Sequence, residues 1–192
     1  MTDFEKVLQS INNTCLNNSF PYIIIGGFAN ILHGSGRTTR DVDIVIFVDY
    51  YEMKRAVNAF EKDFKWRIKD PLQFVEKNFV LPLTHQPTEI EVDVSLGFSG
   101  FEKRALSRSK KMKFKNVELN VCTAEDLILF KLVAARPRDL LDIQEVMQRF
   151  RGKLDVSYLL SIAEDFREVE RSDVFERLTE FLAIYYGEKD GS

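Results

Sequence analysis

Residues 37–46 read RTTRDVDIVI, and this stretch decides the fold that we expect. The apolar and β-branched residues that follow Asp41 predict a β-strand, in which alternate side chains share a face. Asp41 and Asp43 then point to one side of the sheet, while Val42 and its apolar neighbours point into a core. The two aspartate Cα atoms would lie about 6.6 Å apart. Carboxylates so placed predict a metal site or a pair of catalytic acids.

The residues before this strand predict a place for phosphate. A short strand over residues 22–25 ends at Gly26 and Gly27, and a helix is expected over residues 28–33. Glycines let the backbone approach a phosphate closely, and the free N–H groups at the start of a helix attract anions. Arg37 and Arg40 add positive charge beside the acidic pair.

A second acidic strand is expected further along the chain. Residues 79–83 and 90–96 predict a hairpin, and Glu91 and Asp93 share one face of its second strand. Aspartate and glutamate are depleted in strands, so this pattern indicates a function. Three carboxylates on neighbouring strands can hold two Mg²⁺ ions about 3.5–4 Å apart, as phosphoryl and nucleotidyl transfer require. Asp93 and Glu91 compete for the third position.

The chain becomes helical throughout after Thr123, where we expect the end of a core over residues 1–122 and the start of a C-terminal helical region over residues 123–192. Helices are predicted over residues 124–135, 139–150, 156–166 and 173–186.

One basic side chain interrupts the first of these helices. Lys131 lies among apolar residues and either reaches the surface along its stem or contacts a phosphate. Asp139 is either an N-cap or, like Asp142, a site residue.

Composition sets further bounds. The 192 residues are 45% hydrophobic and carry a formal net charge of −3, which does not favour a protein that coats nucleic acid. Cys15 and Cys122 have no partners at metal spacing and indicate buried thiols in a reducing compartment. No run approaches the roughly 20 apolar residues of a membrane helix, so we expect a cytoplasmic protein without membrane contact. The basic residues of segment 103–115 predict a solvated helix face or a track for RNA phosphates.

The ordered motif resembles the signature of the DNA polymerase β-type nucleotidyltransferase superfamily. Gly26-Gly27, residues 37–44 and Asp93 match its glycine turn and its three metal-binding acids. The Arg-x-Thr-x-Asp-x-Asp form is similar to the minimal bacterial branch that includes the AbiEii-type toxins. Residues 131–143 resemble the helical motif of that branch. Gly27 stands where many members carry a serine, which implies phosphate contact through backbone amides.

The resemblance implies an α+β fold, with a nucleotidyltransferase-type mixed β-sheet flanked by helices and a C-terminal helical unit. It implies Mg²⁺-dependent transfer of a nucleoside monophosphate from an NTP to a hydroxyl acceptor. Asp41, Asp43 and Asp93 would bind two Mg²⁺ ions. The nucleotide would be held by a second group of residues, namely Gly26, Gly27, Arg37, Thr39 and Lys131.

The acceptor is open between three hypotheses. It is an RNA such as a tRNA end, in a toxin with a cognate antitoxin protein, or a small molecule such as an aminoglycoside. In the third hypothesis the protein is a nucleotide-binding module that has lost catalysis.

Overall fold

The computed structural model describes residues 1–187, and the chain divides into two compact units. The first consists of Met1–Leu32 and Gly36–Cys122, and the second of His33–Ser35 and the chain from Thr123 onward. One division falls between Cys122 and Thr123. The division into a core over residues 1–122 and a C-terminal helical region over residues 123–192 stays a prediction.

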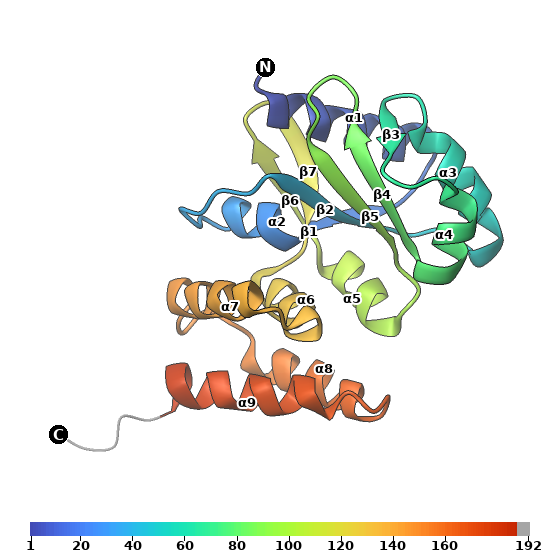
Figure 1. Ribbon diagram of the computed structural model, residues 1–192. Coiled ribbons are helices and arrows are strands. Elements are labelled where there is room, and N and C mark those ends of the chain that lie inside the picture. The colour runs from blue at the N-terminus through green and yellow to red at the C-terminus, as the bar shows by residue number, and fades with distance from the viewer. Residues whose placement is uncertain (188–192) are drawn as a thin grey trace. The chain divides into compact units, whose positions relative to one another are not determined.

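A mixed seven-stranded sheet forms the centre of the first unit (Figure 1), in the order β3-β4-β5-β2-β1-β7-β6. The pairs β2–β5 and β1–β7 are parallel, and the other neighbouring pairs are antiparallel. The strands are β1 Tyr22–Ile25, β2 Asp41–Ile46, β3 Phe64–Trp66, β4 Val80–His85, β5 Glu91–Leu96, β6 Lys110–Phe114 and β7 Val117–Val121.

Helices cover this sheet. Helix α1 packs against β7, α2 against β1 and β2, and α4 against β4. The apolar stripe of α1 is buried, and its first turn is closed by a capping box between Thr2 and Glu5. The helices of this unit are α1 Asp3–Asn17, α2 Gly26–Leu32, α3 Met53–Phe60, α4 Pro71–Asn78 and α5 Gly100–Arg108, with a 3₁₀ turn, η1, over Tyr50–Glu52.

The predicted hairpin over residues 79–96 is confirmed, because β4 and β5 pair in antiparallel register. Two other expectations are corrected. The helical spacing of apolar residues predicts a helix over residues 51–64, but α3 ends at Phe60 and Phe64 opens β3. The basic segment is no single helix face, since α5 ends at Arg108 and the lysines that follow lie on β6. Lysines on an edge strand discourage pairing with another chain.

The second unit is helical, as the sequence predicts. Its helices are α6 Ala124–Ala134, α7 Pro137–Arg149, α8 Val156–Arg167 and α9 Ser172–Tyr186. Thr123 caps α6, because its hydroxyl accepts a hydrogen bond from the Asp126 backbone N–H at 3.2 Å. Asp139 is not an N-cap. It lies in the first turn of α7, where its carboxylate accepts the backbone N–H of Arg136 at 3.2 Å.

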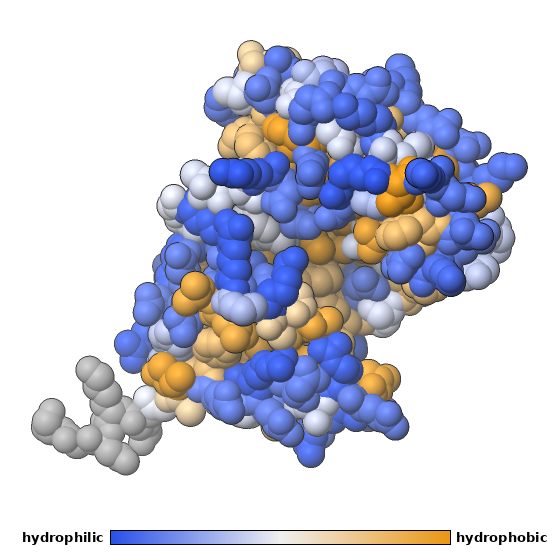
Figure 2. Space-filling view, in the orientation of Figure 1, coloured by the Kyte–Doolittle hydropathy of each residue, from blue (hydrophilic) through white to orange (hydrophobic). Residues whose placement is uncertain are grey.

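Hydrophilic residues dominate the surface visible in Figure 2, with hydrophobic areas between them. None of the helices within residues 1–187 combines the length and the apolar character needed to cross a bilayer.

Candidate active site

The acidic residues of the two central strands lie in register on one face of the sheet. Strands β2 and β5 are parallel, with Asp41 beside Glu91 and Asp43 beside Asp93. Adjacent strands are about 4.8 Å apart, so these side chains are direct neighbours. The residues between them, such as Val42 and the others on the opposite face, are fully buried. The buried apolar face fixes the register, and the register brings the acids together.

Gly26 lies directly against the Asp43 carboxylate. The β1–β2 pairing places Ile25 beside Asp43, and the chain then turns at Gly26 with a φ of +65°. A Cβ atom at residue 26 would lie 2.0 Å from Oδ2 of Asp43. Only glycine accommodates both this backbone conformation and this approach.

Thr39 holds the other aspartate of the strand. Its hydroxyl donates a hydrogen bond to Oδ1 of Asp41, and the residue is buried. Gly27 provides the room for this contact, because a Cβ there would lie 2.8 Å from Oγ1 of Thr39 and 3.4 Å from Nη2 of Arg37. Thr39 therefore contacts Asp41 and lies against Gly27, and the Arg37 guanidinium lies beside Gly27. The roles of these residues in binding a nucleotide stay predictions.

The third acid is paired with an arginine that the sequence analysis does not single out. Arg67 binds Asp93 through Nη2, and its Nη1 donates to Oε2 of Glu91 at 3.0 Å. Burial raises the pKa of Asp93 and outweighs the opposing effect of Arg67, while the charges of Asp41 and Glu91 raise it further. A carboxylate with a raised pKa is better suited to accept a proton.

The donor chemistry of this face suits magnesium, whereas its side chains are not gathered around one point. Carboxylate oxygens are the ligands that Mg²⁺ prefers. Within residues 1–187, however, no three His, Cys, Asp or Glu side chains are placed to hold a metal ion. Asp93 contacts Arg67 instead. The two-ion site therefore stays a prediction, and it requires Asp93 to leave Arg67.

Lys131 belongs to a buried ion cluster of the second unit. Its Nζ donates to Oδ2 of Asp142 at 2.5 Å and to Oδ1 of Asp139 at 3.5 Å, and all three side chains are at most 5% exposed. The expectation that Lys131 reaches the surface is wrong. Its ammonium joins α6 to α7, and its contact with a phosphate stays a prediction.

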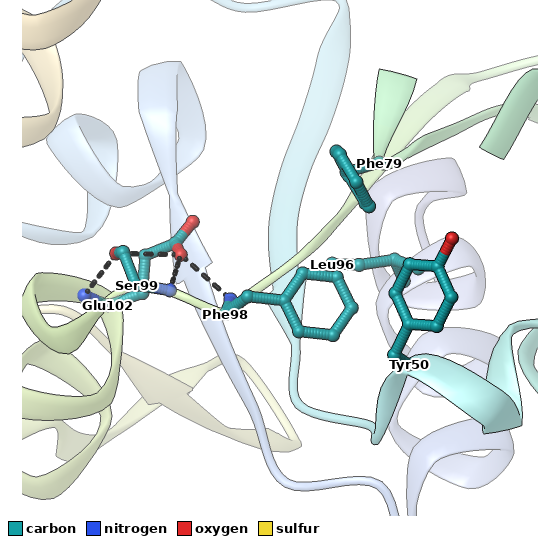
Figure 3. A pocket seen from close by; sticks show the side chains of 6 residues that line it. All are labelled: Tyr50, Phe79, Leu96, Phe98, Ser99 and Glu102. Carbon is teal, nitrogen blue, oxygen red and sulfur yellow. Dashed lines mark hydrogen bonds between the residues drawn. The ribbon is translucent and has the colours of Figure 1, made fainter. Parts of the chain in front are cut away.

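A cavity of about 590 Å³ lies elsewhere in the first unit, among Tyr50, Phe79, Leu96, Phe98, Ser99 and Glu102. Figure 3 shows that its wall is largely aromatic. The Glu102 carboxylate accepts the backbone N–H groups of Phe98 and Ser99 at 3.0 and 2.9 Å, so it serves as a helix cap. Leu96 and Asp93 have opposite parity along β5 and so point to opposite faces. The cavity is therefore not part of the acidic face.

Sequence reasoning missed Arg67 because the contact spans two strands. Arg67 follows β3, and its backbone N–H donates to the carbonyl of Pro82 in β4 at 3.1 Å. Pro82 gives no signal for this contact, because a proline indicates an edge or irregular position of a strand and does not identify the side chain that crosses it.

Solved structures with this fold include several nucleotidyltransferases. The solution structure of the antibiotic-resistance factor ANT(2″)-Ia has a TM-score of 0.61 and 11% identity, and the match covers 90% of this chain and 98% of that one. A nucleotidyltransferase-like protein from Paracoccidioides brasiliensis has a TM-score of 0.52, 17% identity and coverage of 88% and 90%. The lincosamide antibiotic adenylyltransferase LnuA, with lincomycin bound, has a TM-score of 0.51, 18% identity and coverage of 74% and 95%. These likenesses show the fold.

The family is shown by sequence. No curated protein matches the chain. A family model described as "Nucleotidyltransferase of unknown function (DUF6036)" matches residues 2–188, which is almost the whole chain. This chain is therefore a member of that nucleotidyltransferase family.

Proposed function

We propose that this protein transfers a nucleoside monophosphate from an NTP to a hydroxyl acceptor at the acidic face of β2 and β5. The observation that carries the proposal is the register of these strands, in which Asp43 lies beside Asp93. Membership of a nucleotidyltransferase family supports the same reaction class.

The proposed reaction exchanges one P–O bond for another. The acceptor oxygen forms a bond to the α-phosphorus. The bond between the α-phosphorus and the oxygen that bridges it to the β-phosphate breaks, and pyrophosphate leaves. Asp93 would accept the proton of the acceptor hydroxyl as a general base. Asp41 and Asp43 would hold Mg²⁺ together with Asp93, and the metal would supply charge neutralisation for the phosphates.

The remaining predicted residues would bind the nucleotide. Gly26 and Gly27 would present backbone amides to phosphate oxygens, and the Arg37 guanidinium lies beside Gly27. Thr39 orients Asp41. Lys131 would neutralise triphosphate charge only if its buried contacts with Asp139 and Asp142 rearranged.

A small molecule with a hydroxyl group is the acceptor that we favour. One solved structure of this fold is ANT(2″)-Ia with adenylyl-2″-tobramycin, with a TM-score of 0.55, and LnuA holds lincomycin. The RNA acceptor of an AbiEii-like toxin is the second candidate, and the exposed lysines of β6 support it. Two basic side chains of this region have acidic partners, Lys111 with Glu118 at 2.8 Å and Lys115 with Glu5 at 3.6 Å, which weakens that support. A cytoplasmic location belongs to the same proposal, and it is supported by Cys15 and Cys122, which are buried thiols.

Label transfer tests the proposal. The protein is incubated with Mg²⁺ and each α-labelled NTP, together with an aminoglycoside and lincosamide panel or total RNA. We expect labelled product with the wild type and none with Asp43→Asn. Glu118→Gln removes an exposed strand carboxylate of the same sheet and is the matched control, with unchanged activity expected.

The labelled fraction identifies the acceptor. Label in a drug supports the small-molecule hypothesis, and label in RNA supports the toxin hypothesis. Transfer that survives in Asp43→Asn would overturn the assignment of the site. Nucleotide binding without transfer to any fraction would identify a module that has lost catalysis.

A further inference from the structure

Arg67 follows β3 directly and lies at the end of a row of residues that crosses three strands, β4, β5 and β2. Its backbone pairs with Pro82, Pro82 lies beside Asp93, and Asp93 lies beside Asp43. Two strand spacings, about 9.6 Å, separate the backbones at Arg67 and Asp93. The guanidinium therefore reaches Asp93 by passing over β4.

Pro82 makes this crossing possible. The Arg67 N–H donates to the Pro82 carbonyl at 3.1 Å, so the backbone polar groups of Pro82 face β3. A proline has no N–H to donate in return, and β3 ends at Trp66. The side chain of Pro82 is also short, so the long side chain of Arg67 can pass over β4 at this position.

The guanidinium is shared between two carboxylates on the acidic face. Its Nη1 holds Glu91 at 3.0 Å and its Nη2 holds Asp93, while the Arg67 side chain is only 29% exposed. Two adjacent strands carry four carboxylates on this face, namely those of Asp41, Asp43, Glu91 and Asp93. Arg67 is a cation that contacts two of them. A cation at Asp93 competes directly with a metal ion for the same oxygen.

We propose that Arg67 is the resident counter-ion of this face. It holds Asp93 in the substrate-free protein, and a divalent cation binds by taking Asp93 from it. Glu91 retains the guanidinium when Asp93 leaves. This contact gives a role to Glu91, which is the acid of this face that does not belong to the predicted metal ligands. Arg67 and Glu91 are thus positioning residues that act through Asp93. This inference rests on the proposed function.

Binding of Mn²⁺ alone tests the inference without any measurement of turnover. Free Mn²⁺ is followed by electron paramagnetic resonance during titration of the whole protein. We expect Arg67→Gln to bind Mn²⁺ about fivefold more tightly than the wild type, the scale of a partly exposed ion pair. Lys65→Gln removes the same charge from the exposed pair that Lys65 of β3 makes with Glu89, and we expect this variant to match the wild type.

A second variant separates the shared guanidinium from a general effect of charge. Glu91→Gln leaves Arg67 to Asp93 alone, so we expect weaker Mn²⁺ binding in the wild-type background. In the Arg67→Gln background the same change should have little effect, because no guanidinium remains to be retained. An equal loss in both backgrounds would overturn the role of Glu91. Arg67→Lys, which keeps the charge without the two-pronged contact, is expected to lie between the wild type and Arg67→Gln.

The outcomes distinguish the two proposals. If Asp43→Asn abolishes Mn²⁺ binding while Arg67→Gln binds no more tightly than the wild type, the Arg67 inference alone fails. If Asp43→Asn binds Mn²⁺ like the wild type, the metal does not occupy this face, and both proposals fail.

Discussion

Gly26 and Thr39 each fix one of the two aspartates of β2. The Gly26 backbone closes on Asp43, and the Thr39 hydroxyl holds Asp41. Both contacts lie within the motif that the sequence makes visible, so these site residues could be proposed from the chain alone. Arg67 could not, because its partner Asp93 is reached across β4 rather than along a strand.

Gly26→Ala should displace the Asp43 carboxylate. The new methyl group would occupy the position 2.0 Å from Oδ2, and φ is +65° at this residue. A misplacement of about 1 Å in a catalytic group costs on the order of 100-fold in rate. We therefore expect nucleotidyl transfer to fall by about that factor. Gly36→Ala is the control, because a Cβ at Gly36 has no atom within 4 Å. Full activity in Gly36→Ala and Gly26→Ala alike would refute the argument.

Thr39→Val should loosen Asp41 at nearly constant volume. The change removes the hydroxyl that donates to Oδ1 of Asp41. The net value of such a hydrogen bond is about 1–2 kcal/mol, so we expect the unfolding temperature to fall by only a few degrees and kcat/KM to fall about tenfold. Thr38→Val, at the exposed neighbouring position, should keep its activity. A loss of similar size in both variants would mean that the loop as a whole, rather than the Thr39 contact, is responsible.

Among the elements, β2 and β5 could be predicted from their clear alternation, whereas β6 could not. In β2 and β5 the apolar residues alternate with acids, and the predicted parity is the observed one. Strand β6 escaped prediction because Lys110, Lys111 and Lys113 dominate a sequence whose only inward residues are Met112 and Phe114. The order of strands in the sheet depends on pairing between distant segments, which local patterns do not encode.

The ion cluster between α6 and α7 is a second feature of this scale. Lys131→Met would leave Asp139 and Asp142 buried next to each other without their shared ammonium. Removing one partner of a buried ion pair costs about 3–5 kcal/mol. We expect a loss of about 3 kcal/mol in the free energy of unfolding, measured in urea.

Lys65→Met is the matched control, because the pair of Lys65 with Glu89 is exposed and a much smaller change is expected. If Lys131→Met kept its stability but lost nucleotidyl transfer, Lys131 would act at the phosphates instead of in the helix pair.

For the whole molecule, the same cluster predicts how stability depends on pH. Burial raises the pKa of Asp139, but hydrogen bonds from Arg136 and the charge of Lys131 outweigh it, and the net effect lowers the pKa. A lowered pKa means that ionised Asp139 stabilises the folded state at neutral pH. This contribution is lost as the pH falls through the folded-state pKa, below the ordinary value of about 4.

Asp139→Asn tests this dependence. The difference in unfolding free energy between the wild type and Asp139→Asn should be greatest near pH 7 and should shrink below about pH 4. Glu164→Gln, in an exposed pair with Arg167, should differ little from the wild type at any pH. A difference for Asp139→Asn that is constant from pH 7 to pH 3 would contradict the assignment.

The row from Arg67 through Pro82 and Asp93 to Asp43 also sets where the chain tolerates changes in length. A residue inserted into the turn after His85 would lengthen a surface connection and leave every pairing intact. A residue inserted within β4 would shift the rest of that strand by one residue. The side chains beyond the insertion would then point to the opposite face of the sheet, and the pairing with β3 and β5 would lose its register. Insertions and deletions in natural or engineered versions of this protein should therefore accumulate in the turn and be purged from the strand.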